Sequence, residues 1–159
     1  LGSDRWKRRP GGGEFSYYNK NDQRNALARR GPNGVSFEEA ASQFHLSYMI
    51  GNDQTRYSTI ERIRAAGMAT GYRFRVTAAE IQGDELHLRV TNEGVAPIYR
   101  DAFFATGKKR SGETLKGLLP GDDRVISISG VTDKDLAQIA IQSDAILPTQ
   151  RIEYVADLD

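Results

Sequence analysis

The sequence predicts a mainly β protein: an Ig-like antiparallel β-sandwich preceded by a loop-rich basic arm and two short helices. Apolar and polar residues alternate over residues 72–78 and 85–91, which is the period of a strand with one buried face. Clusters of turn residues at 82–84 and 118–123 separate such segments. Before residue 71 the pattern differs, because glycine-rich loops and helical spacing replace the alternation.

The N-terminal arm comprises the first 35 residues, which are rich in Gly, Arg, Asn and Pro. Pro10 and the three glycines after it cannot hold a helix, so we predict a loop with one short strand at residues 14–18. Up to Gly34 the arm carries eight lysines and arginines against three acidic residues. The arm is therefore basic, but the whole chain has a formal net charge of only +1, which does not indicate a nucleic-acid partner.

Two capping boxes predict the two helices. Ser36 with Glu39 begins the first, which apolar residues at helical spacing extend over residues 37–49. Ser58 with Glu61 begins the second. Glycines are expected to end both helices: Gly51 the first, and Gly67 or Gly71 the second.

From residue 72 onward, strands dominate the prediction. The turn at 82–84 joins the two alternating segments into a hairpin, and a helical turn is expected at 131–136. Five further strands are expected: 102–106, 114–119, 124–129, 138–142 and 152–156. Seven strands are typical of a small sandwich. The side chains expected between its two sheets are Phe74, Val76, Leu86, Leu88, Val90, Ile126, Ile128, Ile139 and Ile141.

The chain of 159 residues suits two regions: residues 1–70, the arm plus helices, and residues 71–159, the sandwich. It has no cysteine, which excludes a disulfide and a thiolate metal site. No apolar run is long enough to span a membrane, and no cofactor motif occurs. The chain begins with Leu rather than Met, so we expect it to be processed or part of a longer protein.

The strongest candidate site is the glycine-rich loop from Trp6 to Glu14. Glycines allow backbone to approach a ligand, and Glu14 would sit at the tip as a sugar-site or active-site carboxylate. The alternative, which composition favours, is a flexible terminal arm with one exposed Glu. The second part of the hypothesis is that aromatic side chains provide flat apolar faces on which a sugar ring stacks. Candidate ligand-binding residues are Trp6, Glu14, Tyr17, Tyr18, His45 and Tyr48, with Tyr99, Phe103 and Phe104 as alternatives of which half must fill the core.

The two histidines do not indicate a metal site. His45 lies beside the apolar stripe of the first helix, where we expect a residue at the edge of the core, bonded to backbone, rather than a ligand or a base. His87 falls on the polar face of a strand and is expected to be exposed. Because the two are 42 residues apart without clustered carboxylates, we predict no metal and no cofactor.

Four short motifs, taken in order, carry a family resemblance. They are Arg5-Trp6-Lys7 followed by Pro10 and Gly12-Gly13-Glu14; Phe44-His45-Leu46-Ser47-Tyr48; Gly71-Tyr72-Arg73-Phe74; and the run from Val90 to Pro97. This order resembles the C-terminal part of an uncharacterised bacterial family of glycoside-hydrolase-like TIM barrels with an appended β-sandwich. The resemblance implies that residues 1–70 are the last one or two βα units of a barrel, with Glu14 and His45 near its sugar-binding end. About six units would be missing, and a barrel fragment cannot close.

We therefore expect a non-catalytic carbohydrate-binding or accessory module associated with glycoside hydrolysis. Its partners would be a polysaccharide or oligosaccharide and the missing N-terminal catalytic barrel, in a secreted or cell-surface bacterial setting. One alternative is a fragment of the glycoside hydrolase itself, with Glu14 as a catalytic carboxylate. A third is a structural or assembly subunit that docks through its N-terminal arm. The carbohydrate assignment depends on analogy of fold.

Overall fold

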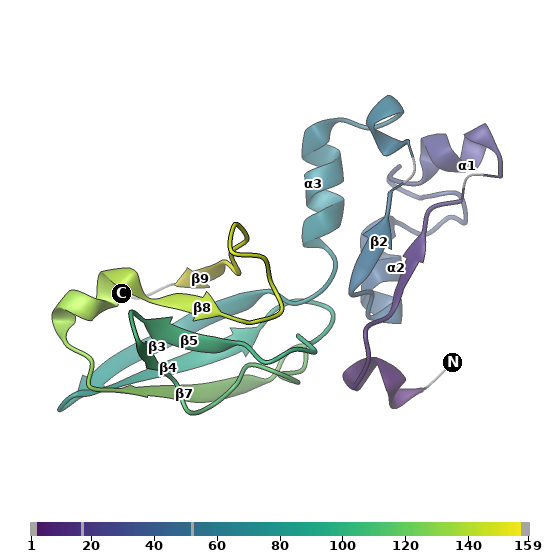
Figure 1. Cartoon of the computed structure of the whole chain (residues 1–159). Helices are drawn as coiled ribbons and strands as arrows, with labels where there is room; N and C mark the ends of the chain where they lie inside the picture. Colours follow the sequence, from purple (N-terminus) through teal and green to yellow (C-terminus); the bar gives the residue numbers. More distant parts are fainter. Residues whose placement is uncertain (1–2, 17, 52, 157–159) are drawn as a thin grey trace. The chain divides into compact units, whose positions relative to one another are not determined.

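The structure, a computed structural model, describes residues 3–16, 18–51 and 53–156. The chain divides into two compact units. The first comprises Leu1–Tyr72 together with Gly94–Ala96, and the second comprises Arg73–Glu93 together with Pro97–Asp159. Strands in sheets dominate the second unit, whereas all the described α-helices belong to the first (Figure 1).

The first unit is built around a pair of short parallel strands. Its elements are the 3-10 helix η1 (Asp4–Lys7), β1 (Gly12–Glu14), α1 (Lys20–Asn25), α2 (Phe37–Phe44), β2 (Tyr48–Ile50), the 3-10 helix η2 (Gln54–Arg56) and α3 (Ile60–Met68). Parallel strands need a long crossover, which the segment containing α1 and α2 supplies. Gly12 pairs with Tyr48 and Glu14 with Ile50, so these four residues share one face of the two strands.

Helix α2 is shorter than the sequence predicts. Its capping box is confirmed, because Ser36 Oγ accepts from the Glu39 N–H at 3.2 Å while Glu39 Oε2 accepts from the Ser36 N–H at 2.9 Å. The helix ends at Phe44 because His45 adopts a left-handed conformation, with φ of 51°, and the chain then extends into β2. The predicted helix over residues 37–49 is therefore wrong beyond Phe44.

Two other element boundaries of the first unit shift. The strand expected at residues 14–18 is wrong beyond Glu14: β1 spans Gly12–Glu14 and begins in the glycine run, for which the sequence predicts a loop. The second helix, α3, is capped by Thr59 rather than Ser58, since Thr59 Oγ1 accepts from the Arg62 N–H at 3.2 Å. It ends at Met68. A small core lies beneath these elements: Leu27, Phe37, Ala41 and Ala66 are buried, and Phe15, Leu46, Met49, Ile63 and Ala69 pack against them.

The second unit contains two sheets. Its strands are β3 (Phe74–Gln82), β4 (Glu85–Asn92), β5 (Phe103–Thr106), β6 (Lys109–Arg110), β7 (Asp123–Ser129), β8 (Ala140–Gln142) and β9 (Tyr154–Ala156), with a 3-10 helix η3 (Asp133–Gln138). One sheet has the order β7-β4-β3-β9 and the other the order β6-β5-β8 (Figure 1). The predicted hairpin is β3–β4, and Gly83 at its turn has φ of 67°. However, β9 pairs with β3 in parallel, so the sheet is not wholly antiparallel as predicted.

The core of this unit follows the predicted alternation closely. In β4, Leu86, Leu88 and Val90 are buried while the residues between them are not. The two sheets meet where the Phe104 ring of β5 packs edge-on against the Tyr154 ring of β9, with centroids 5.1 Å apart. Of the nine predicted core residues eight are buried, and Ile139 is half-buried.

Two further expectations about this unit are wrong. Residues 114–119 form no strand: Gly117 has φ of 71°, which interrupts an extended chain, although Leu115 and Leu118 are buried. His87 is half-buried rather than plainly exposed, and its Nδ1 lies 2.9 Å from Ser127 Oγ on the neighbouring strand β7. The sequence predicts a strand over residues 114–119 because closely spaced leucines are also typical of a half-buried strand. In the structure, turns place both leucines in the core.

Candidate functional site

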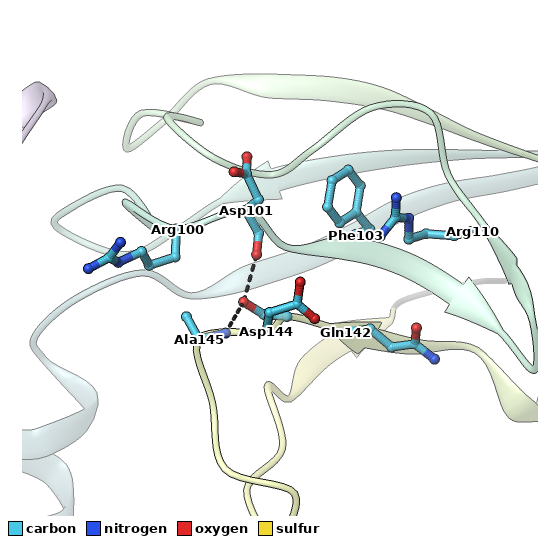
Figure 2. Close-up of a pocket in the computed structure, with 8 residues that line it drawn as sticks. Arg100, Asp101, Phe103, Arg110, Gln142, Asp144 and Ala145 are labelled. Atoms are coloured by element: carbon cyan, nitrogen blue, oxygen red, sulfur yellow. Dashed lines mark hydrogen bonds between the residues drawn. The ribbon is translucent and has the colours of Figure 1, made fainter.

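A pocket lies beside the three-stranded sheet, within the second unit. It has a volume of about 470 Å³ and falls in the range of small-molecule sites, roughly 300–1,000 Å³. Strands β5, β6 and β8 and the segments that flank them supply its lining (Figure 2). The lining residues are Arg100, Asp101, Phe103, Arg110, Gln142, Ser143, Asp144 and Ala145.

The alternation of β5 sends Phe103 to this pocket. Phe104 is fully buried in the core, so its neighbour Phe103 must point to the opposite face of the strand, where it is half-buried. The Arg110 guanidinium carbon lies 4.2 Å from the centroid of the Phe103 ring. This stacking covers one face of the ring and leaves the guanidinium N–H groups at its edge available for hydrogen bonds.

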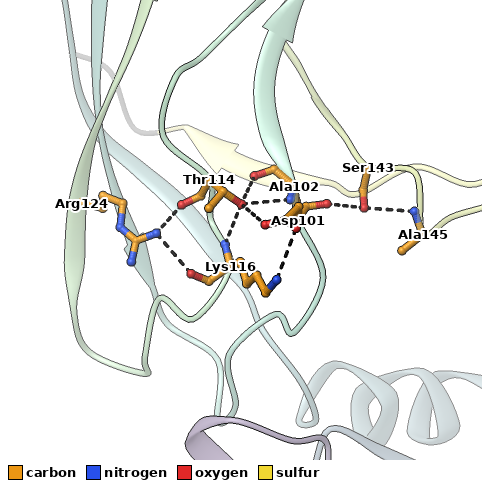
Figure 3. Close-up of polar contacts among 7 residues, drawn as sticks. All are labelled: Asp101, Ala102, Thr114, Lys116, Arg124, Ser143 and Ala145. Carbon is orange, nitrogen blue, oxygen red and sulfur yellow. Dashed lines mark hydrogen bonds and ion pairs between the residues drawn. The ribbon is translucent and has the colours of Figure 1, made fainter.

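A polar network fixes the wall of the pocket around Asp101 (Figure 3). The Asp101 carboxylate accepts from Thr114 Oγ1 and from Lys116 Nζ, both at 3.3 Å. Its backbone carbonyl accepts from Ser143 Oγ at 2.6 Å, and Ser143 Oγ in turn accepts from the Ala145 N–H at 3.3 Å. These bonds connect three segments that are far apart in the sequence, so the wall is organised before any ligand arrives.

Arg124, in β7 of the four-stranded sheet, also stabilises this wall of the pocket. Its Nη1 donates to the carbonyl oxygens of Thr114 and Lys116 (Figure 3). Thr114 Oγ1 also contacts the backbone N–H and carbonyl of Ala102, each at 3.2 Å. The loop containing Thr114 and Lys116 is therefore held at several points although it has no regular structure.

The hairpin of β5 and β6, which carries Arg110, is anchored by η3. Lys109 Nζ lies 2.9 Å from Asp135 Oδ2, and Thr106 Oγ1 donates to the Asp135 carbonyl at 3.1 Å. Asp135 also accepts from the Thr132 N–H at 2.8 Å. The hydrogen bond from Lys109, followed by those from Thr132, lowers the pKa of Asp135 to about 2.

Several polar groups of the pocket are unused within the described part of the protein. The side chains of Arg100, Gln142 and Asp144 are exposed and make no hydrogen bond or ion pair with described residues. They provide five guanidinium donors, an amide donor and acceptor, and a carboxylate acceptor. An aromatic ring beside polar groups that have no hydrogen-bond partner is typical of a site that binds a polar ligand with an apolar face.

The six main site residues predicted from the sequence belong to the first unit, whereas the alternatives Tyr99, Phe103 and Phe104 belong to the second. The described residues of the first group lie at separate places. Trp6 and His45 stack, with ring centroids 3.5 Å apart and planes 11° from parallel. His45 Nδ1 lies 2.8 Å from the Val95 carbonyl oxygen, so the prediction that His45 is bonded to backbone is confirmed. One face of Trp6 is therefore covered by His45 and closed to a sugar ring.

Tyr48 and Glu14 occupy a second location. Tyr48 lies across Gly12, because a Cβ added to Gly12 would come within 2.5 Å of Tyr48 Cζ. Glu14 is exposed on the same face but at the carboxyl end of β1, whereas His45 precedes β2. The resemblance implies that Glu14 and His45 lie near one end of a barrel; in the structure they lie at opposite ends of the strand pair.

The two remaining predicted residues contribute less. Tyr18 is 92% exposed, and Tyr17 lies outside the described residues. The residues that sequence reasoning missed are those of the pocket other than Phe103: Arg100, Asp101, Arg110, Gln142, Ser143, Asp144 and Ala145. Only the paired aromatics Phe103 and Phe104 carried a signal, since a strand must direct one of two adjacent rings outward.

Comparisons with known proteins do not extend this description: no protein-family model matches the chain, and no curated protein does. Among the described residues, no group of three or more His, Cys, Asp or Glu side chains is placed to hold a metal ion. In the same part of the chain, no helix combines the length and the apolar character needed to cross a membrane.

Proposed function

We propose that this chain is a non-catalytic carbohydrate-binding or accessory module. Its sugar site would be the pocket beside β5 and β8, carried by an Ig-like sandwich rather than by the N-terminal arm. The observation that supports this most is the half-buried Phe103 ring beside the uncommitted side chains of Gln142 and Asp144. A saccharide offers both matching features, namely apolar C–H faces and hydroxyl groups that donate and accept hydrogen bonds.

The carboxylates of the pocket favour binding over hydrolysis. A glycosidase needs two carboxyl groups that face each other across the scissile bond. Of the two that line this pocket, Asp101 is already engaged by Thr114 and Lys116. Asp144 remains for a ligand, and as an acceptor it suits a sugar hydroxyl.

Binding across a glycan panel tests this proposal, with Phe103→Ala and Trp6→Ala compared in parallel. Loss of a packed ring costs about 0.5–1.5 kcal/mol, so Phe103→Ala should weaken binding about 2- to 10-fold. Trp6→Ala should leave the affinity unchanged, because Trp6 does not line this pocket. Binding that depends on Trp6 but not on Phe103 would refute the assignment of the sugar site to this pocket. No binding to any glycan would favour the structural or assembly subunit instead.

A second candidate function is a piece of a glycoside hydrolase with Glu14 as a catalytic carboxylate. One observation favours it: Glu14 is exposed at the carboxyl end of a strand in a parallel pair joined by helices. In α/β barrels that end of the strands carries the active site. Turnover of a glycoside by the purified chain, abolished in Glu14→Gln and retained in Glu38→Gln, would establish the hydrolase and overturn the binding module.

A further inference from the structure

The charges of the pocket are unequal once internal pairing is counted. Lys116 Nζ lies 3.3 Å from Asp101 Oδ2, so the Asp101 carboxylate is compensated by a cation outside the lining. The lining then has two positive charges, those of Arg100 and Arg110, and one remaining negative charge, that of Asp144. The lining thus keeps an excess of one positive charge, although the complete chain has a net charge of only +1 spread over 159 residues.

The arginines occupy opposite ends of this pocket. Figure 2 shows Arg100 at one end, Arg110 beside Phe103 at the other, and the Asp101 and Asp144 side chains between them. Arg110 rests on the ring of Phe103, which orients the guanidinium and reduces the conformational entropy lost when it binds a ligand. Arg100 makes no hydrogen bond or ion pair with described residues.

We infer that the pocket binds an anionic oligosaccharide, one whose sugar rings carry carboxylate or sulfate groups. This inference rests on the proposed function. A guanidinium pairs with a carboxylate or a sulfate through two parallel N–H···O bonds, which no neutral hydroxyl can match in strength. Gln142 and Asp144 would bind hydroxyl groups between the charged ends, and the exposed face of Phe103 would contact a ring.

Position within the pocket explains why one free carboxylate does not prevent such binding. Asp144 lies between the arginines, where a hydroxyl donor is required, while the anionic groups of the ligand would be at the ends (Figure 2). An anion placed in the middle would be repelled by Asp144. The arrangement therefore favours a ligand in which charged groups are separated by neutral, hydroxyl-bearing atoms.

Calorimetric titration with matched ligands tests the inference directly. The probes are oligomers of galacturonate, glucuronate and mannuronate, each compared with its own methyl ester. A further probe is a sulfated oligosaccharide whose sugars carry no carboxylate. The esters retain size and hydroxyl pattern but lose the charge. We expect an acidic oligomer to bind at least 10-fold more tightly than its ester, with an affinity that falls as salt is added.

Variants locate the effect. Arg100→Gln and Arg110→Gln should each reduce affinity for the acidic oligomer about 10-fold and leave affinity for the ester within about 2-fold. The control is Arg151→Gln, which removes an equal charge from an exposed arginine of the same unit outside this pocket. Because all three arginines are exposed, unchanged thermal unfolding will show that the variants fold.

The outcomes separate the inference from the proposed function. Equal binding of acids and esters, lost in Phe103→Ala, would overturn the anionic ligand and retain the carbohydrate module. If Arg151→Gln weakens the preference for acidic oligomers as much as Arg100→Gln does, the preference is a general charge effect. That result would overturn the assignment of anion binding to this pocket. Binding of the sulfated oligosaccharide but no uronate would support the anionic class and assign it to sulfate. No binding of any probe would overturn both proposals.

Discussion

Replacement of Asn92 is expected to destabilise the second unit more than any exposed substitution nearby. Asn92 is fully buried at the end of β4. Its Oδ1 accepts from the Arg73 N–H at 3.1 Å, and its Nδ2 donates to the Leu118 carbonyl at 2.9 Å. One side chain thus connects the start of β3 with the loop that follows Thr114.

The expected cost follows from these two bonds. Asn92→Ala would leave the buried Leu118 carbonyl and the partly buried Arg73 N–H without their partners, and an unmade bond of a buried group costs about 1–3 kcal/mol. We expect a loss of about 2–5 kcal/mol in the free energy of unfolding, since a water in the vacated space would offset part of the penalty. Urea titration followed by far-UV circular dichroism measures it, whereas fluorescence of Trp6, the single tryptophan, reports on the first unit.

Two further variants separate the loss of these hydrogen bonds from a general effect of substitution. Asn92→Asp keeps an acceptor for Arg73 but buries a charge and loses the donor to Leu118, so it should be destabilised at pH 7 and partly restored in acid. The exposed substitution Gln82→Ala, on the same hairpin, should cost less than about 0.5 kcal/mol. A cost below about 1 kcal/mol for Asn92→Ala would show that its hydrogen bonds do not support this unit.

Three further predictions concern packing and pH. Leu88→Ala should cost about 2–5 kcal/mol in urea titrations, because Leu88 is buried between the sheets; a cost under 1 kcal/mol would contradict that burial. Because the pKa of Asp135 falls from about 3.8 when unfolded to about 2 when folded, its stabilisation should be complete above pH 4 and disappear as the pH falls towards 2. Asp135→Asn should flatten that acid limb, and an unchanged limb would refute the assignment. Gly12→Ala should destabilise the first unit by about 1–3 kcal/mol through collision with Tyr48, and the cost should vanish in a Tyr48→Ala background.

The second unit was the more predictable part because alternation reports directly on burial. Leu86, Leu88 and Val90 lie on the core face as their spacing requires, and the β3–β4 hairpin has its glycine at the turn. The parallel pairing of β9 with β3 could not be read from the sequence. A strand of three residues has too little pattern to reveal its partner or direction.

The first unit was harder because local signals competed. Apolar spacing from Phe37 to Tyr48 favours one long helix, yet His45 terminates it with a backbone conformation that sequence rarely reveals. The candidate pocket was largely hidden for a different reason. Arg100, Arg110 and Asp144 come from three separate segments, which the pairing of β5 with β6 and β8 and the network around Asp101 bring together.

The location of saccharide binding is the most direct test of the proposed site. Backbone amide NMR spectra of the labelled chain, recorded during titration with an acidic oligosaccharide, would show which residues the ligand affects. We predict chemical-shift changes concentrated at Arg100, Phe103, Gln142 and Asp144, with the signals of Trp6 and Tyr48 unchanged. Shifts confined to the first unit, around Glu14 and Tyr48, would contradict it.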